Sequence, residues 1–125
     1  MNSIKKDIKT HSLSRSSEEV CGFLVKNEGG ALSVIKCNNC SSTPSERFEI
    51  HPEDYLEVKL SSEIIAIYHS HPQSAPMSQA DLMAAEAYAL PCVLYIVPDK
   101  EFDAYYPRYA ETEHIEIVKD LIKND

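Results

Sequence analysis

A short apolar segment, residues 63–68, constrains the fold of this chain most strongly. Its sequence, Glu-Ile-Ile-Ala-Ile-Tyr, is apolar, partly β-branched and short, which predicts a buried β-strand. Ser78 is placed as the N-cap of a helix, because an apolar stripe with helical spacing follows it, and residues 92–97 predict another buried strand. A mixed α/β fold, with a curved mixed β-sheet and flanking helices, is the layering that this pattern favours.

Two histidines, His69 and His71, follow the predicted strand directly. Since residues i and i+2 of a strand point to the same face, we expect both imidazoles to leave the strand end on one side. Asp81 would lie in the first turn of the helix that Ser78 caps and would face back toward the loop. Two nitrogen ligands and one oxygen ligand leave a fourth tetrahedral position open, which a hydrolytic zinc site needs.

Simpler interpretations of both elements stay open at this point. Paired histidines at a strand end are often surface or core residues that hydrogen-bond to the backbone. The segment Ser78-Gln79-Ala80-Asp81 also has the spacing of an ordinary capping box.

The carboxylate of Glu19 is the candidate for the proton transfer that a hydrolase requires. Glu18 and Glu19 stand at the start of an apolar strand pattern, in which Gly22 would allow close approach of the backbone. The alternative is that both glutamates are solvated residues at a strand entrance, and for Glu18 we adopt it.

Together these elements resemble the JAMM (MPN-plus) family of zinc metalloproteases. The family pattern is a Glu-x-x-Gly element, a strand that ends in His-(Ser/Thr)-His-Pro, and then Ser-x-x-Asp. The matching segments, in the same order, are Glu19-Val20-Cys21-Gly22, His69-Ser70-His71-Pro72 and Ser78-Gln79-Ala80-Asp81. The resemblance implies a JAMM/MPN domain, whose architecture is similar to that of cytidine deaminase.

The resemblance also implies roles for individual residues. His69, His71 and Asp81 are expected to bind one Zn2+ ion per chain. Glu19 is expected to be the general acid and base, and Ser78 to help stabilise the oxyanion of the tetrahedral intermediate. The loop between His71 and Asp81 is one residue shorter than the usual family spacing, and loops absorb such changes more easily than helical turns do.

Small bacterial and phage members of the family are the most similar, especially the N-terminal domains of lambda-type tail-assembly proteins. The resemblance implies hydrolysis of a peptide or isopeptide bond in a protein substrate, which is either a ubiquitin-like tail or a phage tail component. One alternative is a non-catalytic MPN-type scaffold or tail-assembly protein that acts by docking. A zinc deaminase is a weaker one, because the chain has no Pro-Cys-x-x-Cys motif with an upstream His-x-Glu.

Length and composition narrow the remaining classes. We expect residues 1–125 to form a single JAMM/MPN domain, because 125 residues can bury one core. The net charge of −8 disfavours nucleic acid as a partner. No apolar run approaches the roughly 20 residues of a membrane helix, and residues 1–9 lack the apolar middle of a signal peptide. We therefore expect a cytoplasmic protein without a membrane partner.

The four cysteines allow two interpretations. Cys37-Asn38-Asn39-Cys40 has a spacing that is typical of zinc or redox sites, but no second such pair exists. Cys21 and Cys92 lie in apolar strand patterns, where buried free cysteine is common. We therefore expect free cysteines in a reduced, cytosolic setting and no second, structural zinc site.

The remaining segments give further expectations. We predict a short N-terminal helix that carries Ile4 and Ile8 and ends before Ser12, a hairpin of residues 20–25 and 31–37, strands over 48–50 and 102–106, and a helix that begins at Pro52 with Tyr55, Leu56 and Leu60 facing the core. His51 is expected to be a surface or capping residue. Residues 113–123 fit either a strand or a helix.

Overall fold

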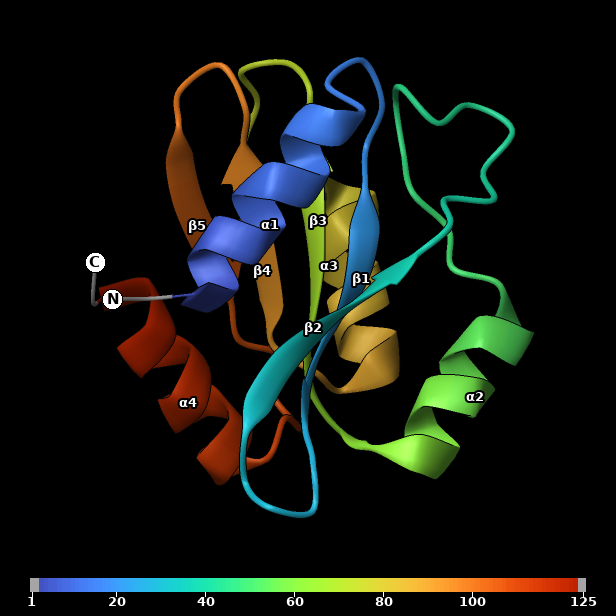
Figure 1. The fold of residues 1–125 in the computed structure, drawn as a ribbon. Helices are drawn as coiled ribbons and strands as arrows, with labels where there is room; N and C mark the ends of the chain where they lie inside the picture. Colours follow the sequence, from blue (N-terminus) through green and yellow to red (C-terminus); the bar gives the residue numbers. More distant parts are fainter. Residues whose placement is uncertain (1–2, 124–125) are drawn as a thin grey trace.

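The computed structural model describes residues 3–123, which form a five-stranded sheet with helices on both faces (Figure 1). The elements in chain order are α1 (Ser3–Ser14), β1 (Cys21–Lys26), β2 (Leu32–Cys37), α2 (Pro52–Ser61), β3 (Glu63–His71), α3 (Gln79–Tyr88), β4 (Cys92–Ile96), β5 (Glu101–Tyr105) and α4 (Thr112–Lys123). The strand order is β2-β1-β3-β4-β5, in which β3 and β4 are parallel and the other neighbours are antiparallel. The predicted mixed α/β fold is confirmed.

Strand β3 occupies the centre of the sheet, and every residue after Glu63 in it is buried. A strand covered on both faces reads as a continuous apolar run, which explains why residues 63–68 stand out in the sequence. The strand is longer than predicted and includes both His69 and His71. Its last residues pair with β4 as far as the match of His71 with Ile96, so the histidines are held by a hydrogen-bonded ladder.

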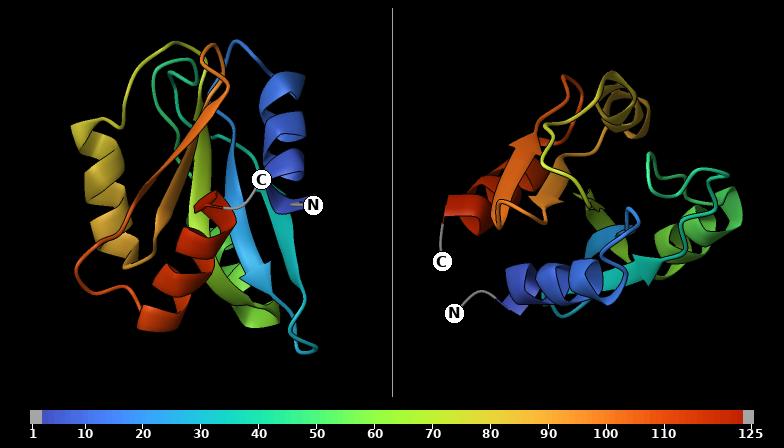
Figure 2. Two further views of the ribbon diagram at one scale, coloured as in Figure 1. Left: turned by 90° about the vertical axis from the view of Figure 1, so that its left-hand side faces the viewer. Right: turned by 90° about the horizontal axis from the view of Figure 1, so that it is seen from above.

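The helices cover the two faces of the sheet in pairs (Figure 2). Helices α1 and α4 pack on one face, in a core that includes Ile8, Tyr68 and Val118. Helices α2 and α3 pack on the other, in a core that includes Ile67 and Ala85. Because side chains alternate along β3, the imidazoles of His69 and His71 point to the same face as Ile67, which α2 and α3 cover.

Gly22 of β1 lies against Tyr68, a residue of the core under α1 and α4. A Cβ atom at this position would lie 2.3 Å from the carbonyl oxygen of Ile35 and 2.5 Å from the ring of Tyr68. The predicted close approach at Gly22 is therefore confirmed. The Tyr68 hydroxyl group and Nδ1 of His11 share a hydrogen bond (2.7 Å). Burial lowers the pKa of His11 to about 4, which keeps that ring neutral.

Two predictions about residues 48–61 are wrong. Residues 48–50 form no strand, although Ile50 is buried. In α2, Leu56 and Leu60 are 54% and 80% exposed, and the buried residue is Val58. Only one side of α2, the side that carries Val58, packs against the sheet. The positions of the apolar residues in the sequence do not show which side of the helix this is.

The other helices and turns agree with the sequence more closely. Residues 113–123, which were ambiguous, belong to the helix α4, in which His114, Val118 and Leu121 are buried. Helix α1 was predicted to end before Ser12 but continues as far as Ser14, and the hairpin β1–β2 is confirmed. None of the helices within residues 3–123 has the length and apolar content needed to cross a membrane.

Candidate metal centre

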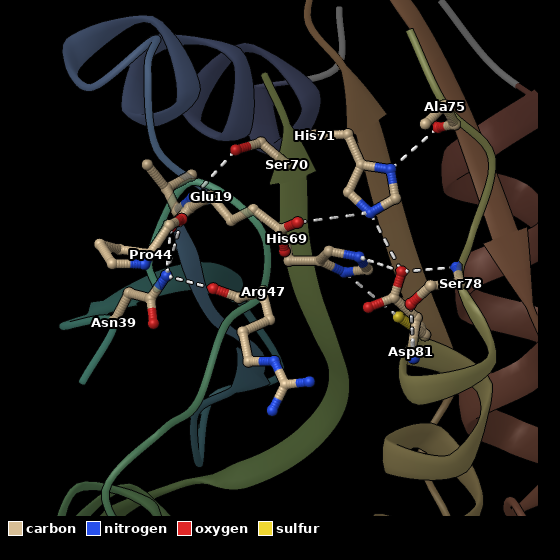
Figure 3. A network of polar contacts seen from close by, with 12 residues as sticks. Glu19, Asn39, Pro44, Arg47, His69, Ser70, His71, Ala75, Ser78 and Asp81 are labelled. Carbon is tan, nitrogen blue, oxygen red and sulfur yellow. Dashed lines mark hydrogen bonds and ion pairs between the residues drawn. The ribbon is translucent and has the colours of Figure 1, made fainter. Parts of the chain in front are cut away.

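Four buried side chains converge where β3 ends and α3 begins (Figure 3). Glu19, His69, His71 and Asp81 each present one nitrogen or oxygen atom, and these atoms all lie within 4.8 Å of one another. Among residues 3–123, they form the only group of three or more histidine, cysteine, aspartate or glutamate side chains that could share a metal ion. The structure thus brings together all the residues that were singled out as ligands or proton acceptor.

Asp81 is fixed by the N-terminus of α3. Its Oδ2 atom accepts a hydrogen bond from the Ser78 amide (2.9 Å), and its own amide donates to Ser78 Oγ (3.1 Å). The predicted N-cap is confirmed, and so is the simpler interpretation of the segment as a capping box. The same Oδ2 atom lies 3.2 Å from His69 Nε2 and 3.0 Å from His71 Nε2. The capping box therefore also aims the carboxylate at the histidines.

Both imidazoles are oriented through their Nδ1 atoms. His71 Nδ1 donates a hydrogen bond to the carbonyl oxygen of Ala75 (2.9 Å), and His69 Nδ1 lies 3.5 Å from Cys92 Sγ. A metal-binding histidine ordinarily uses its second nitrogen in this way, which fixes the ring and leaves Nε2 for the metal. The loop that holds Ala75 is itself tied down, because Ser74 Oγ hydrogen-bonds to the carboxylate of Asp99.

Two neighbouring side chains add to this support. The ring of Phe48 stacks on His69 with 4.6 Å between the ring centroids and 28° between the planes. Ser70, which lies between the two histidines, points to the other face, and its Oγ accepts a hydrogen bond from the Val20 amide (2.9 Å). Ser70 therefore joins β3 to the residue that follows Glu19.

The ionisation of His69 and Asp81 suits a cation, whereas His71 must first lose a proton. Burial lowers the pKa of His69, which keeps its ring neutral. Burial alone would raise the pKa of Asp81, but the two imidazole Nε2 atoms close to its carboxylate hold that pKa well below its usual range. Burial likewise opposes the charge on His71, yet the hydrogen bonds to Asp81 and Ala75 raise its pKa. The raised pKa favours a proton on His71 in the metal-free protein, and this proton must leave before the ring can bind a metal.

Glu19 approaches the histidines from the opposite side. Its Oε2 atom lies 3.8 Å from His71 Nε2, and the side chain is buried. Burial raises the pKa of Glu19 to about 7; the nearby charge of His71 lowers it and that of Asp81 raises it. A carboxyl group with this pKa exchanges protons near neutral pH.

The raised pKa predicts how the stability of the metal-free protein depends on pH. Folded Glu19 holds its proton up to about pH 7, whereas the unfolded group loses it near its model value of 4.5, so the folded state binds more protons between these values. Stability from this group is complete below pH 4.5 and is lost as the pH rises through 7. Relative to Glu19→Gln, which does not titrate, the wild-type protein should lose on the order of 3 kcal/mol between pH 4.5 and 8. Urea unfolding of both proteins without metal measures this, and parallel pH profiles would contradict it.

The unpaired atoms of this group test whether a metal fits. Three buried side-chain nitrogen and oxygen atoms within residues 3–123 have no hydrogen-bond partner, and two of them are His69 Nε2 and Glu19 Oε1. Such orphaned atoms call for an unseen ion or water molecule. Ligand atoms at about 2.1 Å from a tetrahedral zinc ion lie roughly 3.4 Å apart, close to the 3.0 and 3.2 Å from Asp81 Oδ2 to the two imidazoles. Two imidazoles and one carboxylate fit zinc.

The capping histidine of α2 and the four cysteines do not belong to this group. His51 is the N-cap of α2, and its Nδ1 accepts a hydrogen bond from the amide of Glu53 (3.1 Å), as expected. Cys21 and Cys92 are buried and free, and Cys37 and Cys40 are free as well. The Cys37–Cys40 pair joins no metal-capable group among the residues that the structure describes.

Comparison with known sequences identifies the fold family. A sequence model of the prokaryotic homologues of the JAB domain matches residues 2–109. The chain belongs to this family. The resemblance to JAMM/MPN proteins that the motifs indicate is thereby confirmed.

The similar proteins include a phage tail protein and an archaeal enzyme. The tail tip assembly protein K of Escherichia phage N15 is 29% identical over 102 residues, which are 81% of this chain and 42% of the phage protein. The chain thus spans less than half of that relative. A desampylase of Pyrococcus furiosus is 33% identical over 118 residues, which cover 89% of this chain and 81% of that protein.

A solved structure supports the fold of the JAB domain. The crystal structure of a JAB1/MPN domain protein from Archaeoglobus fulgidus matches with a TM-score of 0.55 and 18% sequence identity. The match covers 86% of this chain and 84% of the other. At this identity the similarity concerns the fold alone.

Several residues of the site were missed in the sequence. Cys92 and Ser70 follow from strand pairing and alternation, once β3 is known to continue through His71. Phe48 was assigned to a strand that does not form. Asn39 lies in a polar loop, and no spacing of residues in the sequence reveals the hydrogen bonds that its side chain makes.

Proposed function

We propose that this JAB domain is a zinc-dependent hydrolase of peptide or isopeptide bonds. The observation that carries the proposal is the convergence of two imidazole Nε2 atoms on one carboxylate oxygen, Asp81 Oδ2, beside the buried carboxyl group of Glu19. A relative at 33% identity is named a desampylase, which supports a hydrolytic activity.

In the proposed mechanism, His69, His71 and Asp81 hold the zinc ion. When bound, zinc would acidify a water molecule and polarise the carbonyl group of the substrate. Glu19, whose pKa is near 7, accepts the proton of the attacking water and passes it to the leaving amine.

Ser78 keeps one hydrogen-bonding capacity for the substrate. Its Oγ accepts the Asp81 amide in the capping box, so the hydroxyl hydrogen is still available as a donor. In the proposed mechanism the Ser78 hydroxyl group donates a hydrogen bond to the oxygen that becomes negatively charged as the tetrahedral intermediate forms. The helix cap and the oxyanion contact thus use different parts of one hydroxyl group.

The proposed substrate is an extended protein tail, either of a ubiquitin-like protein ending in Gly-Gly or of a phage tail component. Such a tail can add to a strand at the edge of a sheet, and β2 and β5 are the edges here. A second candidate function is docking without chemistry, which the relative named tail tip assembly protein K favours.

Metal removal tests the proposed function. The purified protein should bind one zinc ion per chain and should cleave an internally quenched peptide in which a Gly-Gly carboxyl group is joined to a lysine ε-amine. Chelation should abolish cleavage, and added zinc should restore it, because the described residues form no second group that could hold a metal ion. Cleavage that persists in the zinc-free protein would contradict the proposal, whereas zinc binding without cleavage of any tail would favour docking.

A further inference from the structure

One asparagine side chain organises the loop beside Glu19. We call residues 38–49, which connect β2 to the segment before α2, the rim loop (Figure 3). Asn39 Nδ2 donates hydrogen bonds to the carbonyl oxygens of Glu19 (2.9 Å) and Arg47 (2.9 Å). Its Oδ1 accepts from the amides of Ser41 (3.0 Å) and Glu49 (3.1 Å). The carboxamide therefore closes the rim loop on itself and ties it to Glu19.

The backbone of Glu19 is held from both sides by this loop. The Glu19 amide donates to the carbonyl oxygen of Pro44 (2.8 Å), while its carbonyl oxygen accepts from Asn39. Asn39 Nδ2 also lies 3.4 Å from the same Pro44 oxygen. The Glu19 carboxylate has one oxygen without any hydrogen-bond partner among the described residues. Its position is therefore set mainly through its backbone and by burial.

We propose that Asn39 is a positioning residue for Glu19, so that the rim loop and the proton acceptor are placed as one unit. This inference rests on the proposed function. Asn39 does not touch the candidate metal ligands; it acts on the backbone from which the Glu19 side chain extends. Misplacement of a reacting group by about 1 Å can cost roughly 100-fold in rate, so a small shift of this backbone has a measurable effect.

The two halves of the carboxamide can be separated by one substitution. In Asn39→Asp, both oxygens can accept, so the bonds from Ser41 and Glu49 are kept. The donated bonds to Glu19 and Arg47 are lost, because an ionised carboxylate has no hydrogen to donate and repels a carbonyl oxygen. The matched control is Asn38→Asp, which adds the same charge one residue away, at an exposed position.

Cleavage of the quenched Gly-Gly–lysine peptide should separate the two variants. We expect kcat of Asn39→Asp to fall about 10- to 100-fold, with KM changed less than about threefold and one zinc ion still bound. Asn38→Asp should stay within about twofold of the wild-type protein. A loss of folding alone would instead reduce the zinc-loaded fraction and leave kcat per zinc ion unchanged.

Amide hydrogen exchange of the metal-free protein gives a readout that does not depend on activity. Exchange at the Glu19 amide should become at least about tenfold faster in Asn39→Asp but not in Asn38→Asp. The Ile67 amide of β3, which donates to the carbonyl oxygen of Pro91, is the internal reference. Equal kcat and equal Glu19 exchange in the two variants would overturn the inference. Cleavage that persists without zinc, or no cleavage by the zinc-loaded wild-type protein, would instead refute the proposed function itself, so the two failures are distinguishable.

Discussion

Glu19→Gln is expected to lower kcat for cleavage by about 10²- to 10⁴-fold while one zinc ion per chain stays bound. Glutamine has the shape of the protonated glutamate but cannot accept and return a proton. The three candidate ligands lie on β3 and α3, not on the segment that carries Glu19, so the metal should remain in place. Steady-state kinetics with the quenched peptide, together with metal analysis of the same sample, measures both effects.

The neighbouring glutamate provides the control. Glu18 is partly exposed and lies 3.6 Å from Arg15, so Glu18→Gln removes the same charge one residue away from the site. We expect less than a twofold change in kcat, because exposed ion pairs contribute little. If both variants keep wild-type kcat, Glu19 is not the proton acceptor; if both lose it, the effect comes from the local net charge.

His71→Ala is expected to reduce zinc affinity by well over 100-fold and to abolish cleavage. Loss of a residue that merely supports a ligand already costs about 10- to 100-fold in affinity, and His71 would be a ligand itself. The substitution leaves Asp81 with one imidazole instead of two in a buried site. Titration with zinc, followed by calorimetry, measures the affinity.

His51→Ala is the matched histidine control. His51 caps α2 on the surface, so its loss should cost roughly 1 kcal/mol of stability and leave one zinc ion bound. Full zinc occupancy and full activity in His71→Ala would remove the basis of the metal centre. Loss of zinc from His51→Ala as well would indicate that general unfolding, and not ligation, controls the metal content.

The parts of the site that follow from local patterns were predictable. Residues 63–68 are apolar because β3 is covered on both faces, and the period of two along a strand then places His69 and His71 together. Ser78 and Asp81 are linked by a helix-capping rule that operates within four residues. Glu19 depends on a long-range contact, and here the order of motifs in the family supplied what local chemistry could not.

The parts that failed depend on contacts between distant segments. Phe48 packs against His69 without joining a strand, because ring stacking and hydrogen bonds to residues 39 and 40 hold this segment in place of a strand ladder. Leu56 and Leu60 lie outside since only a narrow side of α2 reaches the sheet. Asn39 binds backbone groups of the rim loop and of Glu19, and the polar sequence of the loop does not reveal these hydrogen bonds.

The three proposed zinc ligands belong to one continuous segment, residues 69–81. Glu19 lies far upstream in the sequence and joins the site through the antiparallel pairing of β1 with β3 and through the rim loop. In the proposed mechanism, ion retention and proton transfer are thereby encoded in separate pieces of sequence. A single codon change at Glu19 would leave a folded, ion-loaded protein that still recognises a polypeptide tail. Catalysts and inert adaptors built on this scaffold can consequently be one mutation apart.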